Sequence, residues 1–296
     1  MSVIDINNLT KDYGNNKGVF DLSFKIEKGE AFGFLGPNGA GKTTTIRHLL
    51  GFLNSDKGTC KINGLDCRTQ SAEIEKKLGY LPGEIAFLDE MKGIDFLKYV
   101  AELKGMKDLT KMNELISFFE LDPSGRLKKM SKGMKQKIGI VSAFMSDPDV
   151  LILDEPTSGL DPLMQSKFVD LIEKEKAAGK TILMSSHSFE EVERTCDRVG
   201  IIKNGRLVTI EQVATLKSSQ RKQYIINFTS KEEADNFQKE SFDIKEVNGR
   251  HVTVSITGQI SPLIKALANY SVSSLDTKTQ SLEDIFMHFY GGDDNE

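Results

Sequence analysis

The feature that most constrains the fold of this chain is the run GPNGAGKT at positions 36–43. It fits the pattern G-x-x-x-x-G-K-[ST] in full, an apolar run (31–35) precedes it, and a helix-compatible run begins at position 42. Glycines at this spacing let successive backbone N–H groups face one concavity, and those donors together with a helix start favour phosphate. The sequence therefore predicts a buried strand, a phosphate-binding loop and a helix in direct succession.

The residues of this loop have separate expected roles. Lys42 is expected to reach the β- and γ-phosphates of a nucleotide, Thr43 to place its hydroxyl on Mg²⁺, and Thr44 to donate to a neighbouring phosphate oxygen. A glycine-rich turn that fits the pattern by chance is the alternative, but the strand before the loop and the helix after it count against that. The predicted phosphate site consists of Gly36, Pro37, Asn38, Gly39, Ala40, Gly41, Lys42, Thr43 and Thr44.

A second motif, VLILDE at positions 150–155, places four apolar residues before two carboxylates. A buried strand of this kind delivers Asp154 to the mouth of a sheet, where the carboxylate can hold Mg²⁺ through a water molecule. Glu155 follows on the other side of the pleat and can orient or deprotonate an attacking water. By itself the motif is equally consistent with a strand that ends in solvated acids. Beside a phosphate loop it predicts hydrolysis of ATP with Mg²⁺ bound.

Short apolar runs alternate with helix-like stretches through the first two thirds of the chain. Strands separated by helices predict an α/β fold with a largely parallel sheet that is covered on both faces. Residues 42–52 and 94–120 are expected to be mostly helical, the second stretch with apolar side chains at helical spacing. The expected strands are 3–9, 20–26, 31–35, 59–62, 150–153, 181–185 and 198–202.

The pattern changes near position 216, and a polar stretch at 217–222 is expected to link two domains, 1–216 and 223–296. The second domain shows strand and helix signals in the order β-α-β-β-α-β, with Asn248-Gly249 as a hairpin turn. This order predicts a small ferredoxin-like α+β domain. It carries no nucleotide or metal motif, so we expect it to pair two subunits or to regulate ATPase activity.

Composition narrows the function classes. A formal net charge of −4 with 28% charged residues gives no global basic field, so no nucleic-acid partner is expected. The three cysteines form no C-x-x-C pair, which indicates reduced thiols in a cytosolic protein. The N-terminus lacks the basic start and apolar stretch of a signal peptide, and no apolar run approaches the ~20 residues that span a bilayer. Work at a membrane is therefore expected to need another, membrane-spanning chain.

Four further segments lie in a fixed order around these motifs. MSKGMKQK at 130–137 is similar to an LSGGQ signature and SGLD at 158–161 to a D-loop. His187, after an apolar strand, is similar to a switch histidine, and Tyr13 to an aromatic that stacks on adenine. Taken singly, such features are more often a helix cap, a solvated lysine face, a half-buried histidine and a turn aromatic. In this order they resemble the ATP-binding subunits of ABC transporters, over residues 1 to about 215.

This resemblance implies a P-loop ABC ATPase domain with a mixed sheet and a helical subdomain at about 84–145. In this family two subunits pack head to tail, so Ser131 and Gly133 are expected to close on the ATP held by the other subunit. That subunit is expected to be an identical copy or a paralogue. Asp161 is expected among the nucleotide-binding residues. The expected catalytic residues are Lys42, Glu155 and His187.

Two motifs depart from the family pattern, at three positions. Gly83 stands where the family usually has a Gln, at the end of the strand that leads into the helical subdomain. We expect Glu84, the next residue, to take over the metal and water contact of that Gln. The signature has Lys132 in place of a glycine and Met134 in place of a glutamine, while its serine and second glycine are retained.

The Lys-Gly of the signature and the segment SLEDIF at 281–286, within an expected last helix at 281–290, resemble subunits of bacterial exporters. Such exporters carry drugs, antimicrobial peptides or lipid-linked molecules. The resemblance implies a separate polytopic membrane-spanning partner and a place at the cytoplasmic face of the cell membrane. A helix of that partner is expected to dock beside residues 84–105. Ordinary packing within the helical subdomain explains the same apolar side chains equally well, namely Ile85, Phe87, Leu88 and Met91.

Two other function classes stay open. One is a non-transport ABC ATPase that acts on DNA or ribosomes, and the other is a regulatory ATP-binding module without turnover. DNA-repair members insert a long coiled coil between their lobes, translation-factor members carry two ATPase units in tandem, and 296 residues hold only one unit. A module without turnover would not need the set Lys42, Asp154, Glu155 and His187.

Overall fold

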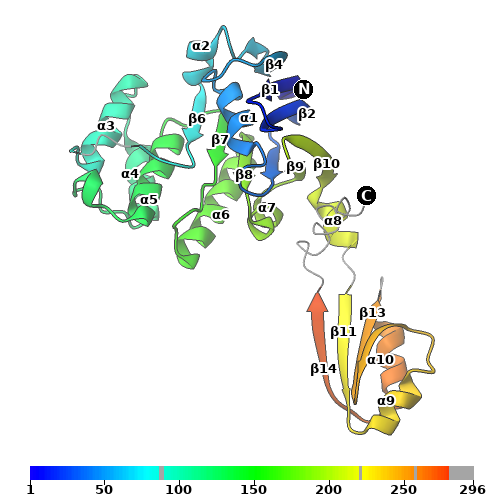
Figure 1. Ribbon diagram of the computed structural model, residues 1–296. Helices are drawn as coiled ribbons and strands as arrows, with labels where there is room; N and C mark the ends of the chain where they lie inside the picture. The colour runs from blue at the N-terminus through cyan, green and yellow to red at the C-terminus, as the bar shows by residue number, and fades with distance from the viewer. Residues whose placement is uncertain (87–89, 220–221, 257–258, 280–296) are drawn as a thin grey trace. The chain divides into compact units, whose positions relative to one another are not determined.

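The structure is a computed structural model, and it describes residues 1–86, 90–219, 222–256 and 259–279. The chain divides into two compact units, Met1–Val213 and Ala214–Glu296 (Figure 1). Each unit has its own sheet or sheets and its own buried core. None of the helices in these described ranges is both long enough and apolar enough to cross a membrane.

The larger unit is built on a six-stranded sheet in the order β10-β9-β3-β8-β7-β6. Its pairs are parallel except β9 with β10. Every residue of β3, β7 and β8 is buried, as expected for parallel strands that are covered on both faces. The strands are β3 (Ala31–Leu35), β6 (Leu78–Leu81), β7 (Val150–Asp154), β8 (Thr181–Ser186), β9 (Arg198–Lys203) and β10 (Arg206–Gln212).

A second, antiparallel sheet in the larger unit has the order β2-β1-β4-β5. Three strands that the sequence predicts for one largely parallel sheet lie here instead. The burial of β2 alternates along its second half, because one face packs on the core and the other faces solvent. The Phe24 and Phe32 rings stack 5.2 Å apart and join the two sheets. The strands are β1 (Ser2–Asp12), β2 (Gly18–Glu27), β4 (Lys57–Ile62) and β5 (Leu65–Asp66).

Helices cover these sheets. Helix α1 (Lys42–Leu49) contacts β2, β4 and β7, so it lies between the two sheets. Helix α7 (Phe189–Thr195) contacts β3, β8 and α6 (Pro162–Ala177). A short helix, α2 (Ser71–Glu75), contacts β6. The loop between β3 and α1 therefore opens at the carboxyl end of the central sheet, where ligands bind in folds of this class.

A helical lobe stands beside the central sheet (Figure 1). The sequence predicts a mostly helical stretch at 94–120, and the structure breaks it into two helices after Leu103. Gly105 has a φ of +66° and its N–H donates to Glu102 O over 2.9 Å, which ends the first helix. The lobe consists of α3 (Gly93–Leu103), α4 (Thr110–Phe118), the 3₁₀ turn η1 (Leu127–Lys129) and α5 (Lys132–Phe144), and α5 also contacts β6.

The smaller unit has four strands in the order β12-β13-β11-β14, and all neighbours are antiparallel. With a helix after β11 and another after β13, this is the ferredoxin-like arrangement that the sequence predicts. The core side chains of both helices pack with those of β11 and β13 on one face of the sheet. The elements are α8 (Val213–Ser219), β11 (Lys222–Phe228), α9 (Lys231–Phe237), β12 (Asp243–Asn248), β13 (His251–Ile256), α10 (Ser261–Leu267) and β14 (Val272–Thr279).

Two further sequence-based expectations concern this end of the chain, a linker and a last helix. The stretch 217–222, expected to be a linker, contains the last residues of α8 and the first residue of β11. The helix expected at 281–290, with the SLEDIF segment, lies outside the described residues.

Candidate functional site: a nucleotide pocket at the carboxyl end of the central sheet

The loop that joins β3 to α1 curls tightly, as the sequence predicts. Gly36 N–H donates to Ser186 O over 3.3 Å, and Ala40 N–H donates to Pro37 O over 3.1 Å. Gly41, directly before α1, has a φ of +111°, which residues with a side chain rarely adopt. This curl and the helix start that follows it make the loop suitable for an anion.

Lys42 opens α1, and its side chain is only 5% exposed. Its Nζ donates to Gly36 O over 2.7 Å and to Pro37 O over 3.2 Å. Burial lowers the pKa of Lys42, while the nearby carboxylates of Glu155 and Asp154 act in the opposite direction. The buried ammonium thus lies over its own loop, where it can bind phosphate oxygens through charge-assisted hydrogen bonds.

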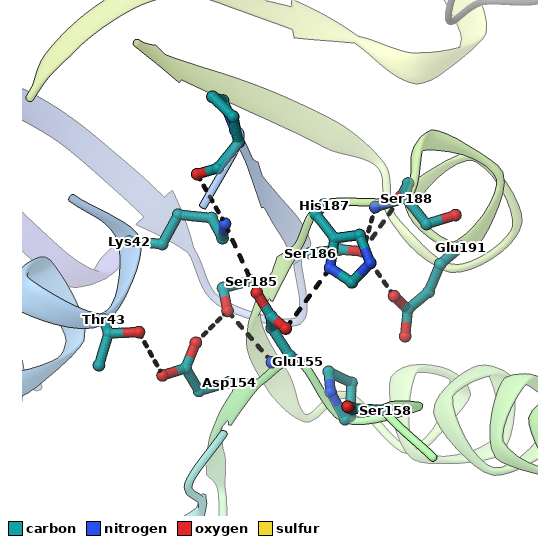
Figure 2. A network of polar contacts seen from close by, with 12 residues as sticks. Lys42, Thr43, Asp154, Glu155, Ser158, Ser185, Ser186, His187, Ser188 and Glu191 are labelled. Carbon is teal, nitrogen blue, oxygen red and sulfur yellow. Dashed lines mark hydrogen bonds and ion pairs between the residues drawn. The ribbon is translucent and has the colours of Figure 1, made fainter. Parts of the chain in front are cut away.

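Thr43 and Asp154 are in contact although 111 positions separate them in the sequence. Thr43 Oγ1 donates to Asp154 Oδ2 over 2.8 Å, and Ser185 Oγ donates to Asp154 Oδ1 (Figure 2). Across the described ranges, no group of three or more His, Cys, Asp or Glu side chains is arranged to hold a metal. A hydroxyl and a carboxylate fit Mg²⁺ nonetheless, because Mg²⁺ uses one or two protein oxygens and takes the rest from water and phosphate.

Glu155 follows Asp154 in a left-handed backbone conformation, with a φ of +47°. Such a conformation costs energy for a non-glycine residue and is concentrated at functional sites. Glu155 N–H donates to Ser185 O over 3.1 Å, so the chain turns out of β7 at this point. The carboxylate lies between two groups, Lys42 Nζ at 3.6 Å and His187 Nδ1 at 3.4 Å (Figure 2).

His187 follows β8, and its side chain is 59% exposed. Its ring points toward Glu155, while the serines on either side bind to each other (Figure 2). Ser188 N–H donates to Ser186 Oγ over 2.9 Å, and Ser186 Oγ lies 2.6 Å from Glu191 Oε2, to which it donates. The backbone around the histidine is therefore fixed more firmly than the imidazole itself.

A single pocket of about 470 Å³ contains Tyr13 and the phosphate loop. Tyr13 is exposed, its N–H donates to Lys17 O over 2.8 Å, and Lys11 Nζ lies 5.9 Å from its ring centroid. An exposed ring at the mouth of this pocket can stack on a base. The predicted residues that line it are Tyr13, Asn38, Gly39, Gly41, Lys42, Thr43, Thr44 and Glu155. Five further lining residues were not identified from the sequence, namely Asn16, Lys17, Gly18, Asn204 and Gly205.

The signature residues lie elsewhere, at the start of α5. Ser131 caps this helix, since its Oγ accepts from Met134 N–H over 3.2 Å, as the sequence predicts. A Cβ on Gly133 would come within 2.8 Å of Gly159 O, so the helix start packs directly on the segment after Glu155. Lys132 Nζ donates to Ser158 Oγ over 2.9 Å. The lysine that replaces a glycine thus joins the signature to the D-loop of the same chain.

Gln136 makes a second link between α5 and that segment. Its side chain is buried, and Nε2 donates to Pro156 O over 2.8 Å and to Glu155 O over 3.4 Å. Gln136 was not identified from the sequence, because a glutamine five residues after the cap gives no local signal. Ser185 and Glu191 were missed for the same reason, since their partners are distant in the sequence or their role appears only in three dimensions.

Three predicted positions need separate mention. Asp161 caps α6, where Oδ1 accepts from Met164 N–H over 3.0 Å, a structural role that the sequence analysis did not anticipate. Gly83 lies beside Asp154, and a Cβ there would be 3.3 Å from Asp154 Oδ2. Glu84, the next residue, is exposed. The departure from the family pattern at Gly83 therefore touches the predicted metal site directly.

Known proteins resemble this chain over most of its length. The sequence profile of the ABC transporter family matches residues 19–158. The ABC transporter ATP-binding protein YhcH of Bacillus subtilis (strain 168) is 32% identical, over 98% of this chain and 96% of that protein. The bacitracin transport ATP-binding protein BcrA of Bacillus licheniformis is 33% identical, over 98% of each. A solved structure of an ATP binding subunit of an ABC transporter is 30% identical, with a TM-score of 0.67 over 73% of this chain and 92% of that one.

These similarities confirm the predicted P-loop ABC ATPase fold, with its mixed sheet and helical lobe, and the predicted ATP binding and hydrolysis. The site geometry agrees with them, since the loop lysine, the two carboxylates and the histidine converge (Figure 2). The chain is an ATPase and belongs to the family of ABC transporter ATP-binding proteins.

Proposed function

We propose that this chain hydrolyses ATP to power the export of a substrate across the cytoplasmic membrane, through a separate polytopic membrane-spanning subunit. The observation that carries this proposal is the 33% identity to BcrA, which extends over 98% of each chain and so includes the second unit. The name of BcrA assigns it to bacitracin transport, which supports a cargo among the drugs, antimicrobial peptides and lipid-linked molecules expected for this chain.

In the proposed site, the triphosphate binds along the curled loop and the first turn of α1, with Lys42 on the β- and γ-phosphates. Tyr13 stacks on adenine at the mouth of the pocket. Thr43 and Asp154 hold Mg²⁺, which when bound neutralises charge on the phosphate oxygens. The support for this arrangement is the 2.8 Å contact between Thr43 Oγ1 and Asp154 Oδ2 and the shared pocket lining.

Glu155 is the proposed base that orients or deprotonates the attacking water, and His187 contacts the γ-phosphate. The contact of Glu155 with both Lys42 and His187 supports this assignment. A carboxylate held between an ammonium and an imidazole is aimed at one point, as a general base requires. Hydrolysis then changes the charge next to His187 and releases the contacts that the γ-phosphate made.

We assign Ser131 and Gly133 to the nucleotide of a second ATP-binding subunit, either an identical copy or a paralogue. The start of α5 is favourable to anions, because the first N–H groups of a helix have no partner within it and the helix dipole is positive there. The pocket around the phosphate loop is lined by other segments. A head-to-tail dimer brings each signature to the nucleotide of the other chain, so ATP binding closes the dimer and hydrolysis opens it.

An exposed apolar surface beside the helical lobe is the proposed docking site for the membrane-spanning partner. Phe52 is 62% exposed, and its ring lies 6.3 Å from that of Tyr80. These two rings and Leu78 line a pocket of about 160 Å³ with Leu50 and Ile74. The surface can accept apolar side chains of a helix.

This surface differs from the sequence-based expectation for residues 84–105. A Cβ on Gly139 would lie 2.5 Å from Ile85 Cδ1, so Ile85 packs within the helical lobe, as the alternative interpretation holds. Met91 is half-buried, and its carbonyl oxygen accepts from Leu127 N–H over 2.8 Å. Phe87 and Leu88 lie outside the described residues.

Purification of the full chain from its native membranes tests the proposal. We expect one polytopic protein to accompany the wild-type chain and to be lost with Phe52→Glu, which places a charge on the docking surface. The ATPase rate of the isolated Phe52→Glu chain should match wild type, because Phe52 lies outside the nucleotide pocket. Purification without any polytopic partner, or with the same partner for both chains, would contradict the proposed docking.

A further inference from the structure

We propose that Glu191 is a positioning residue for ATP hydrolysis, because its carboxylate holds the turn that carries His187. Glu191 lies in α7, and its Oε2 accepts a hydrogen bond from Ser186 Oγ over 2.6 Å (Figure 2). The same Ser186 Oγ accepts from Ser188 N–H over 2.9 Å. The carboxylate thereby fixes both residues that flank His187. The assignment depends on the role proposed above for His187.

The histidine needs such support because its own side chain is mostly in solvent. His187 is 59% exposed, and its ring contacts Glu155 Oε2 at 3.4 Å. An exposed ring keeps much of its rotamer freedom, so its position relative to the phosphate loop depends on the backbone that carries it. Ser186 supplies that backbone anchor, and it also accepts through its carbonyl from Gly36 N–H. The turn held by Glu191 therefore touches the phosphate loop directly.

The carboxylate of Glu191 is held at a cost to the folded state. Its Oε1 is buried and lacks a hydrogen bond of normal length among the described residues. Burial raises the pKa of Glu191, while the hydrogen bond from Ser186, the nearby Thr157 hydroxyl and His187 act in the opposite direction. A buried carboxylate with one incompletely paired oxygen is unfavourable for stability. Buried polar groups that are incompletely paired and bring no structural gain are characteristic of functional sites.

Glu191 also lines a cavity together with Glu155 and His187. The cavity, of about 310 Å³, is lined by Glu155 and Ser158 together with Ser186, His187 and Glu191. Glu190 and Arg194, from the same helix, are the other charged residues of its lining. Glu191 thus lies where the histidine turn and the segment after Glu155 meet.

A double-mutant cycle on the full chain tests the assignment through kcat and KM for ATP. Glu191→Leu and Ser186→Ala each remove the same hydrogen bond, so each should lower kcat about tenfold or more while KM changes less than about twofold. The double variant should be no slower than the slower single variant. Glu191→Gln keeps an oxygen acceptor for Ser186 and should retain at least about half of kcat.

Stability separates this role from a structural one. Glu191→Leu should change Tm little, because the lost hydrogen bond from Ser186 is offset by the removal of a buried carboxylate, whereas a residue kept for stability alone would lower Tm. Glu173→Leu, at an exposed glutamate of α6 outside this cavity, is the matched control and should leave kcat unchanged. If Glu191→Leu does not fold, Ser186→Ala and Glu191→Gln still decide the question.

His187→Ala distinguishes the two proposals. If it leaves kcat unchanged, the proposed role of His187 is wrong, and the assignment of Glu191 fails with it. If His187→Ala lowers kcat but Glu191→Leu or Ser186→Ala does not, only the assignment of Glu191 is overturned. Multiplicative losses in the double variant, or a Glu191→Gln chain as slow as Glu191→Leu, would also overturn it.

Discussion

The Thr43 hydroxyl donates a hydrogen bond to the Asp154 carboxylate over 2.8 Å, which joins the start of α1 to the end of β7. Both residues lie at the carboxyl end of the central sheet, where folds of this class bind their ligands. One strand thus delivers the phosphate loop and a second delivers the carboxylate to the same point. A metal ion bound there contacts the loop that holds the nucleotide and the strand that carries the proposed base.

Replacement of Asp154 should weaken the binding of Mg²⁺ by the enzyme. Asp154→Asn should raise the Mg²⁺ concentration for half-maximal ATPase activity about tenfold or more, a size seen when groups around a metal are altered. The physical reason is the loss of the buried negative charge that faces Thr43. A Mg²⁺ titration of the steady-state rate measures the shift, with the exposed Asp170→Asn as control. An unchanged titration curve would show that the metal binds elsewhere.

Glu84 is proposed to take over the role of the glutamine that the family usually has at the position of Gly83. Glu84→Ala should lower kcat about 100-fold, the lower end of contributions from positioned acid–base groups. Its neighbour Gly83 lies against Asp154, which brings Glu84 within one residue of the metal site. Steady-state ATPase rates measure the effect, and Glu102→Ala, another exposed glutamate, is the control. Wild-type rates in Glu84→Ala would remove Glu84 from the site.

Gln136 should matter for stability and turnover together. Gln136→Leu leaves the carbonyl oxygen of Pro156 without its buried donor, so the free energy of unfolding should fall by about 1–3 kcal/mol. Because the same amide reaches Glu155 O, kcat should fall as well. Denaturant unfolding and ATPase rates measure the two effects, with Lys135→Leu as a neighbouring control. Loss of stability with full activity would separate Gln136 from the position of Glu155.

The protonation of Glu191 gives the stability a defined pH dependence. Burial raises its pKa above the ordinary value of 4.5, so at pH values between the two the folded state binds more protons than the unfolded state. The free energy of unfolding that Glu191 contributes is therefore present at lower pH and decreases as pH rises through that window.

Glu191→Gln removes this titration. Relative to wild type, Glu191→Gln should gain stability as pH rises above 4.5 and should be more stable by about 1 kcal/mol near neutral pH. Denaturant unfolding of both chains from pH 4 to pH 8 measures the difference. A difference that does not change with pH would mean that Glu191 keeps its ordinary pKa.

The parts of the site that the sequence predicts are those that lie within short contiguous segments. The phosphate loop and the pair Asp154-Glu155 each combine an apolar strand with chemically distinctive residues, so periodicity and motif agree. Gln136 and Glu191 carry no such signal, because their partners lie on other segments and become visible only after folding. Asp161 shows the converse, since a residue expected at the nucleotide also serves as a helix cap.

The fold shows the same division. Four strands of the central sheet, β3, β7, β8 and β9, are predicted correctly because buried parallel strands are short and continuously apolar. The antiparallel edge strand β10 was not predicted. The assignment of β1, β2 and β4 to a separate antiparallel sheet was missed, because strand pairing depends on contacts between residues distant in the sequence, such as Ile4 opposite Ile62. The ferredoxin-like order of the second unit was predicted because each element is short and bounded by turn residues such as Asn248-Gly249.

The measurement that tests the central account most directly is the behaviour of Glu155→Gln with ATP and Mg²⁺. The amide keeps the shape of the carboxylate but cannot act as a base, so turnover should fall about 100-fold or more while ATP still binds. We expect this chain to elute as an ATP-dependent dimer in gel filtration and to return to monomer when ATP is removed. Wild-type turnover in Glu155→Gln would contradict the account, as would a chain that binds ATP and remains a monomer.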